Sequence, residues 1–107
     1  LTRTHRYRER DRKIVLKKKN KTLKETGSLQ CEVCEFDFRE RYGDHGDGFI
    51  ECHHTKPVSE INVGEKTTLD DLSLVCSNCH RMIHRHRPWL KIDELKNLLG
   101  LGGSLEN

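Results

Sequence analysis

Two C-x-x-C pairs constrain this chain more than any other feature of its sequence. They are Cys31–Cys34 and Cys76–Cys79, separated by 41 residues. Each pair lets two thiolates from one tight turn reach a single ion, and two such turns give the four-sulfur site of a structural zinc. Disulfides are disfavoured because the cysteine count of five is odd and no secretory pattern is present. A thioredoxin-like redox pair would need no second C-x-x-C, so we predict one structural zinc and a buried strand position for Cys52.

The composition agrees with a need for such a metal. The chain has 107 residues, of which 33% are hydrophobic and 35% are charged, so it can bury only a modest core. A structural zinc site contributes on the order of 10 kcal/mol to folding. No apolar run reaches membrane-spanning length and no signal peptide is recognisable. We therefore expect a single cytoplasmic domain with no membrane contact. Because the chain begins at Leu1 rather than Met, it could be a fragment of a longer protein.

Periodicity and breakers predict a small set of elements. We expect helices over residues 5–25, 36–42, 77–86 and 92–99, and strands over 49–53 and 72–75. Residues 43–48 and 55–68 are expected to be loops, and Phe36, Phe38 and Tyr42 are expected to contribute to the core. The chain then divides into an N-terminal helical arm at 1–26, a domain at 27–100 and a flexible tail at 101–107.

The N-terminal arm is strongly basic. Residues 1–26 carry eleven Lys or Arg against three acidic residues, a net charge of +8, and include the run Lys17, Lys18 and Lys19. This density is typical of a segment that binds phosphates. On charge alone, a solvated helix or a disordered tail explains the arm equally well.

The histidines form a second pattern. Six of the seven fall within residues 45–86. His80 and His84 are four residues apart, so on a helix they share one face and can bind one divalent ion. His53 or His54 would supply the third ligand, and the other could accept a proton from water, since an imidazole has a reference pKa of about 6.5. The strand is then expected to bend or end at this pair so that both rings face one cavity. Histidines scattered over a surface are the alternative.

The stretches "ECHHTKPV" at 51–58 and "LDDLSLVCSNCHRMIH" at 69–84 resemble the HNH endonucleases, or ββα-metal nucleases. The resemblance covers roughly residues 27–86. It implies an α+β fold, a small ββα-metal (His-Me finger) domain with a four-cysteine zinc site and flanking helices, so that 27–100 is the HNH nuclease domain. It also implies His53, His80 and His84 as ligands of a catalytic metal and His54 as the general base.

One position departs from the family pattern. The middle asparagine of the family falls at Asp71, which could orient the base as a hydrogen-bond acceptor or could join the metal. Glu51 matches an acidic residue of colicin-type sites and would orient a metal ligand, or would be an exposed strand residue. Arg81 and Arg85 lie on the metal-binding helix and would grip DNA phosphates, or would be merely solvated.

The resemblance implies metal-dependent hydrolysis of DNA phosphodiester bonds in a restriction-type or phage-type system. The family commonly uses Mg²⁺ or Mn²⁺, and three imidazoles also suit Ni²⁺ or Zn²⁺. The expected partner is DNA, with a homodimer and a separate DNA-recognition domain, not contained in this sequence, as further candidates. A non-catalytic, zinc-stabilised nucleic-acid-binding module is the main alternative, but it leaves the four clustered histidines without a purpose. A zinc hydrolase of small molecules is disfavoured by the basic arm.

Overall fold

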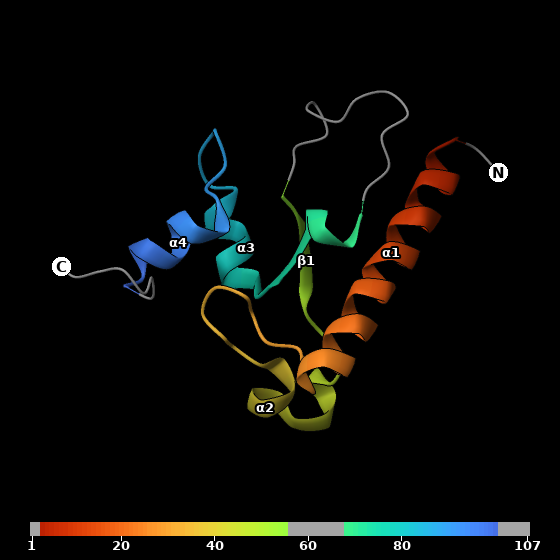
Figure 1. Cartoon of the computed structure of the whole chain (residues 1–107), viewed down its shortest axis with the longest axis horizontal. Helices are drawn as coiled ribbons and strands as arrows, with labels where there is room; N and C mark the ends of the chain where they lie inside the picture. The colour runs from red at the N-terminus through yellow and green to blue at the C-terminus, as the bar shows by residue number, and fades with distance from the viewer. Residues whose placement is uncertain (1–2, 56–67, 101–107) are drawn as a thin grey trace.

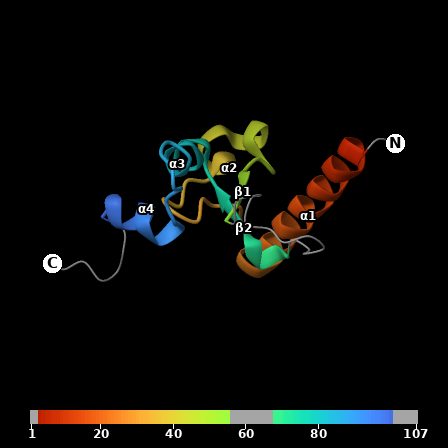
Figure 2. The same ribbon diagram turned by 90° about the horizontal axis from the view of Figure 1, so that it is seen from above.

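The computed structural model describes residues 3–55 and 68–100, with side chains from Arg12 onward. A helical arm, a hairpin and two further helices make up most of it. In chain order the elements are α1 (Arg3–Thr26), α2 (Phe38–Tyr42), a 3-10 turn (Gly43–Gly46), β1 (Glu51–His54), a second 3-10 turn (Leu69–Asp71), β2 (Leu72–Val75), α3 (Ser77–Ile83) and α4 (Ile92–Leu98). In Figure 1 and Figure 2, α1 and α3 lie on opposite sides of the hairpin. The predicted small α+β fold is therefore confirmed.

The two strands form an antiparallel hairpin whose register runs from Glu51 opposite Val75 to His54 opposite Leu72. All four positions of β2 are buried. The predicted strand at 72–75 is confirmed, whereas the strand predicted at 49–53 begins and ends one or two residues later. Strand β1 ends at His54, one of the two expected alternatives, but it does not bend there, because His54 pairs regularly with Leu72 and Thr55 N donates to Asp71 O at 2.9 Å. Neighbouring side chains of β1 therefore point to opposite faces.

The first cysteine turn is fixed against β2. Cys31 N donates to Phe36 O and Glu35 N donates to Cys31 O, each at 2.9 Å, which closes the turn. Glu32 then bonds twice to Leu74: its N–H donates to Leu74 O at 2.8 Å, and its carboxylate accepts from Leu74 N at 2.7 Å. Because the second cysteine turn follows β2 directly, these bonds bring the two turns together.

The main core is built around the cysteines. Val33, Val75, Ile83 and Leu95 are buried together with Cys31, Cys76 and Cys79. A smaller cluster consists of Leu29, Ile50 and Leu74, with Cys52 packed against it. Burial is the favourable term that offsets the ordering of the chain, and here the thiols supply part of it.

Two residues differ from their predicted burial. Phe36 and Phe38 pack against the main core with ring centroids 4.8 Å apart, as expected. Tyr42, however, is 58% exposed because α2 ends there and its ring stacks on the outer side of Phe38. Cys52 is partly exposed rather than buried, because it lies on an edge strand of a two-stranded sheet.

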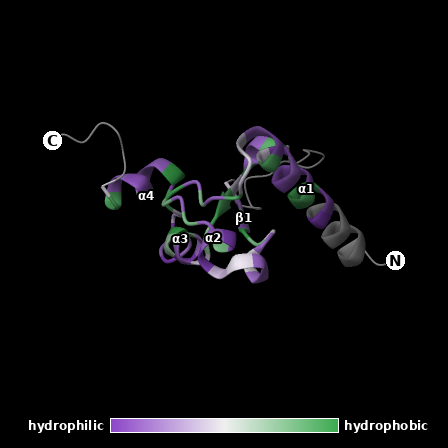
Figure 3. Cartoon of the chain, turned by 90° about the horizontal axis from the view of Figure 1, so that it is seen from below, coloured by the Kyte–Doolittle hydropathy of each residue, from purple (hydrophilic) through white to green (hydrophobic). Residues whose placement is uncertain are grey.

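Several predicted boundaries also shift. The loop predicted at 43–48 contains a 3-10 turn in which Gly46 is buried against the backbone of Phe38. The helix predicted at 77–86 ends at Ile83, and the one predicted at 92–99 ends at Leu98. Most of the loop predicted at 55–68, and the tail at 101–107, lie outside the described residues. Helix α1 is hydrophilic over most of its described length (Figure 3), and no helix in the described part has the length and apolar character needed to cross a membrane.

Candidate metal centres and active site

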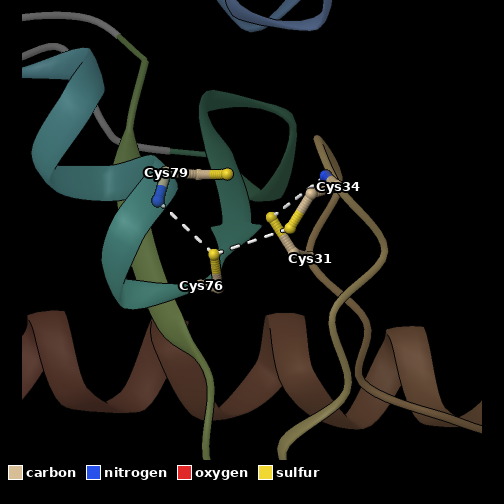
Figure 4. Close-up of side chains that lie close together, drawn as sticks. All are labelled: Cys31, Cys34, Cys76 and Cys79. Atoms are coloured by element: carbon tan, nitrogen blue, oxygen red, sulfur yellow. Dashed lines mark hydrogen bonds between the residues drawn. The ribbon is translucent and has the colours of Figure 1, made fainter. Parts of the chain in front are cut away.

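The four paired cysteines converge as their spacing predicts. In Figure 4 the sulfurs of Cys31, Cys34, Cys76 and Cys79 point toward one another from the two turns. All four ligand atoms lie within 4.8 Å of one another, and the Cys34 and Cys76 sulfurs are 3.7 Å apart. A tetrahedral zinc with Zn–S bonds of about 2.3 Å separates its sulfurs by about 3.8 Å. The donor set and its spacing therefore fit a structural zinc ion.

The backbone around the first turn favours thiolate. Burial would raise the pKa of the Cys31 thiol, but hydrogen bonds from backbone groups of Cys34, Cys76 and Val33 outweigh it and leave the pKa below its ordinary value. Burial raises the pKa of Cys34 and of Cys79. Four thiols this close cannot all ionise without a cation, because their negative charges would repel one another. A divalent ion removes this conflict, and thiolate is the form that zinc binds.

A second cluster gathers three imidazoles from two elements. His53 comes from β1, His80 from α3, and His84 from the residue that caps the C-terminus of α3. Their candidate ligand atoms lie within 4.8 Å of one another, and His53 Nδ1 is 3.2 Å from His84 Nε2. Metal–nitrogen bonds of about 2.1 Å place tetrahedral nitrogen ligands about 3.4 Å apart. The cluster therefore fits one divalent ion with three protein ligands.

Burial prepares two of these rings to bind a cation. His53 is 3% exposed. Burial first, and the positive charge of His84, His80 and His54 second, lower the pKa of His53 to about 4. Burial and the neighbouring His80 also lower the pKa of His84. Neutral imidazole is the form that binds metals, so these two rings need not lose a proton to bind one near neutral pH.

Glu51 orients the third ring. Its Oε1 lies 2.9 Å from His80 Nδ1, and its Oε2 accepts from Ser77 Oγ at 2.8 Å. The hydrogen bond with His80 lowers the pKa of Glu51 most, and the hydrogen bond from Ser77 lowers it further. Together they keep this pKa below its usual value despite partial burial. With Nδ1 engaged by the carboxylate, Nε2 is the ring nitrogen of His80 that is left for a metal. Metal-bound histidines are commonly held in this way by a carboxylate, so this contact favours the orienting role predicted for Glu51 over that of an exposed strand residue.

Trp89 covers the histidine cluster and was not foreseen from the sequence. Its ring centroid lies 4.1 Å from that of His84 and 5.6 Å from that of His53. The chain turns after α3 and returns, with Leu90 N donating to Ile83 O at 3.2 Å, which brings the indole back over the rings. The only signal in the sequence was the position of Trp89, directly after Pro88 and a few residues after His80 and His84.

His54 lies outside the three-histidine cluster. As the next residue on β1, it points to the opposite face and lines a hollow next to α1 together with Arg12, Val15, Leu16 and Lys19. Both rings were expected to face one cavity. The regular strand instead separates them, with His53 on the α3 side and His54 on the α1 side.

Asp71 connects the segment before β2 to the end of β1. Its carboxylate accepts hydrogen bonds from Thr68 N at 2.9 Å and from Thr68 Oγ1 at 3.1 Å. Its carbonyl accepts from Thr55 N at 2.9 Å and from Thr55 Oγ1 at 3.0 Å. Among the described residues Asp71 does not join either ligand cluster. These contacts fix the backbone beside His54, and orientation of the base by the Asp71 side chain stays a prediction.

The predicted DNA-binding residues lie on two elements. Arg81 on α3 and Arg85 after it are exposed, as is Lys17 on α1. Lys18 and Lys19 are partly buried, and Lys19 Nζ donates to Gly48 O at 3.1 Å. Cationic side chains therefore stand on both sides of the hairpin.

Together, the hairpin, α3, the four-cysteine cluster and the three histidines define a ββα-metal domain with a structural-zinc type of site. The profile of one family, described as HNH endonuclease, matches residues 31–86. This match covers more than half of the chain, and the chain belongs to the HNH endonuclease family. Searches of curated proteins and of solved structures return no match.

Proposed function

We propose that this chain is a metal-dependent endonuclease that hydrolyses phosphodiester bonds in DNA. The observation that carries the proposal is the cluster of His53, His80 and His84 beside a further histidine, His54, on the same strand. Membership of the HNH endonuclease family supports a nuclease. A module that only binds nucleic acid needs the four cysteines but gives no reason for three convergent imidazoles.

In this proposal His54 is the general base. Its ring would accept a proton from the attacking water, a role that contributes about 10²–10⁴-fold in rate. Attack on phosphorus and departure of the leaving oxygen are roughly in line, so the groups that assist them belong on opposite sides of the phosphate. Because His53 and His54 lie on opposite faces of β1, a phosphate that both the metal and the base serve would lie at the open edge of this strand. Asp71 would help by fixing the backbone on which His54 stands.

His53, His80 and His84 would hold the catalytic metal, with Glu51 fixing the His80 ring. A divalent ion bound there supplies Lewis-acid stabilisation of negative charge on the phosphate and on the leaving oxygen. The family commonly works with Mg²⁺ or Mn²⁺. Three imidazoles favour Mn²⁺, Ni²⁺ or Zn²⁺ by ligand type, whereas Mg²⁺ prefers oxygen ligands.

DNA would be bound through phosphates from both sides of the hairpin. Arg81 and Arg85 extend from the metal-binding side, and α1 contributes Lys17, Lys18 and Lys19. In this scheme residues 1–26 are a binding arm of the nuclease domain at 27–100. A restriction-type or phage-type role, a homodimer that cuts both strands, and a separate DNA-recognition domain are further parts of the proposal that rest on the family resemblance alone.

Cleavage of supercoiled plasmid tests the proposal. The full chain, loaded with zinc, is assayed with Mg²⁺, Mn²⁺, Ni²⁺ and Zn²⁺ beside His54→Ala and the control His45→Ala, which changes an exposed histidine outside the site. We expect nicked or linear DNA with at least one metal, loss of about 10²-fold or more in His54→Ala, and full activity in His45→Ala. Equal activity in all three proteins, or none in the wild type with any metal, contradicts the proposal.

A further inference from the structure

A hollow between α1 and the strand that carries the proposed base is a second place where the described residues converge. It has a volume of about 420 Å³ and is lined, within the described residues, by Arg12, Val15, Leu16, Lys19 and His54. The four helical positions follow the i, i+3, i+4, i+7 spacing of one helix face. One face of α1 is therefore turned toward the side of β1 on which His54 lies.

The chemistry of this face suits a nucleic-acid strand. Arg12 and Lys19 stand at its two ends, seven residues and so about 10 Å apart along the helix axis. Val15 and Leu16 lie between them, and Leu16 is 59% exposed. The phosphates of one DNA strand form a closely spaced row of negative charges, so two cations at this separation can bind two phosphates of the same strand. The apolar side chains between them could face sugars and base edges.

The two cations are available to a ligand in different ways. Arg12 is exposed, and neither salt bridge found among the described residues engages it. Lys19 is partly buried and donates to Gly48 O at 3.1 Å, which uses one of the three protons of its ammonium group. Lys19 is therefore held in place beside the hollow with donors to spare, while Arg12 can close on a bound phosphate.

We propose that this hollow holds the DNA strand that is cut, with Arg12 and Lys19 binding phosphates next to the scissile one. His54 lines the hollow and would face the scissile phosphate at the edge of β1, where the metal held by His53, His80 and His84 would reach it from the other face. This inference rests on the proposed nuclease function and deepens it, since it assigns the path of the substrate. The proposal also divides the Lys and Arg side chains of α1 into those that face His54 and those that do not.

The chain offers a matched control in Lys21. This lysine is exposed and lies two residues, or about 200°, around the helix from Lys19, so it faces away from the hollow. Arg12→Gln, Lys19→Gln and Lys21→Gln each remove one positive charge from the same helix. Lys19→Arg keeps the charge and a donor to Gly48 O, and it separates a lost phosphate contact from a loosened helix.

The first readout is binding of a duplex oligonucleotide by the zinc-loaded full chain, without a second metal, at 50 to 200 mM salt. Each lost phosphate contact should lower the slope of log K against log salt by about 0.9. We expect this loss for Arg12→Gln and Lys19→Gln, and unchanged slopes for Lys21→Gln and Lys19→Arg. Equal slopes for Arg12→Gln, Lys19→Gln and Lys21→Gln would overturn the assignment of the hollow.

The second readout compares cleavage of duplex DNA with cleavage of a thymidine dinucleotide, which has one phosphodiester and no flanking phosphates. Arg12→Gln and Lys19→Gln should each lose about tenfold or more in kcat/KM on the duplex and should match the wild type on the dinucleotide. An equal loss on both substrates would contradict binding of flanking phosphates.

The two proposals fail in distinguishable ways. If the wild type cuts DNA and all three Gln variants cut it equally well, the hollow is wrong and the nuclease stands. If the wild type cuts nothing while the salt slopes fall as predicted, the nuclease fails and the phosphate-binding hollow stands.

Discussion

The four-cysteine cluster and the three-histidine cluster are neighbours in the fold but differ in burial and in the number of candidate ligands. The four-cysteine cluster is part of the main core, with Cys31, Cys76 and Cys79 between 1% and 6% exposed. The histidine cluster runs from His53, at 3% exposed, to His80 and His84, which are partly exposed. Four protein ligands complete a tetrahedral ion, whereas three leave a position for water or substrate. A site closed by four protein ligands is typical of a structural ion, and a site with three protein ligands is typical of a catalytic ion.

Helix α3 serves both clusters. Cys79 and His80 are consecutive on it, yet one belongs to the sulfur cluster and the other to the imidazole cluster. Strand β1 contributes only to the second cluster, through His53. Loss of the four-cysteine site should therefore remove the histidine site as well, because the cysteines anchor α3. Loss of the histidine site should leave the four-cysteine site and the fold intact.

The largest effect is expected from Cys76→Ser, which tests the structural role of the four-cysteine cluster. Cys76 also caps α3, its sulfur accepting from Cys79 N at 3.4 Å. Structural zinc contributes about 10–16 kcal/mol in small domains, more than most domains have in reserve. We expect loss of bound zinc and an unfolded circular dichroism spectrum. Cys52→Ser, which changes the cysteine outside the cluster, should keep both; zinc loss from Cys76→Ser with an unchanged melting curve would contradict the structural role.

A smaller effect on the stability of the fold is expected from a change of pH, and it acts through the buried ring of His53. The pKa of His53 is lowered to about 4, whereas in the unfolded chain it is about 6.5. As pH falls from 6.5 to 4 the unfolded state gains a proton that the folded state does not. Above pH 6.5 this term vanishes, and by pH 4 it destabilises the fold by about 3 kcal/mol.

His53→Gln isolates this term, because the zinc site is common to both proteins and cancels in their difference. Urea unfolding at fixed zinc, without a second metal, should show the stability of the wild type declining relative to His53→Gln as the pH is lowered from 6.5 to 4. A difference that does not change with pH would mean that burial of the ring does not resist protonation.

A further, smaller effect sharpens the role of Glu51. Removing a carboxylate that holds a metal-binding histidine costs about 10–100-fold in metal affinity. Glu51→Ala should weaken binding of the second metal to this extent, while Glu51→Gln, which keeps an acceptor for His80 Nδ1, should weaken it less. Isothermal titration with Mn²⁺ measures this, with Glu40→Ala as a control at an exposed glutamate on α2. If Glu51→Ala binds Mn²⁺ as Glu40→Ala does, Glu51 does not position a ligand.

Features that depend on local spacing were predictable from the sequence. A C-x-x-C turn places two thiols at one point whatever surrounds it, and the separation of His80 and His84 puts both rings on one side of a helical turn. Both features appear as predicted. The alternation of β-strand side chains also follows from local geometry, but the expectation of a bend or an end at His53 and His54 set it aside. Strand β1 does end at His54, yet its regular pairing with Leu72 shows that both rings still alternate between faces.

Features that depend on long-range packing were not predictable. The return of Trp89 over His84 depends on a hydrogen bond from Leu90 to Ile83, which no periodicity encodes. The approach of α1 to His54 depends on contacts such as that of Lys19 with Gly48, 29 residues apart. Tyr42 has the right spacing for a core residue, but α2 is only five residues long, and its ring ends outside the packed layer.

The most direct test of the account is Mn²⁺ titration of the zinc-loaded full chain, carried out on the wild type, His53→Ala and His54→Ala. The account predicts one additional Mn²⁺ site in the wild type, a strongly weakened site in His53→Ala and an unchanged site in His54→Ala. The cysteine-bound zinc should be retained in all three, because these rings lie outside that cluster. An unchanged Mn²⁺ site in His53→Ala with a lost one in His54→Ala would exchange the two roles, and loss of the cysteine-bound zinc from either variant would contradict the separation of the two metal centres.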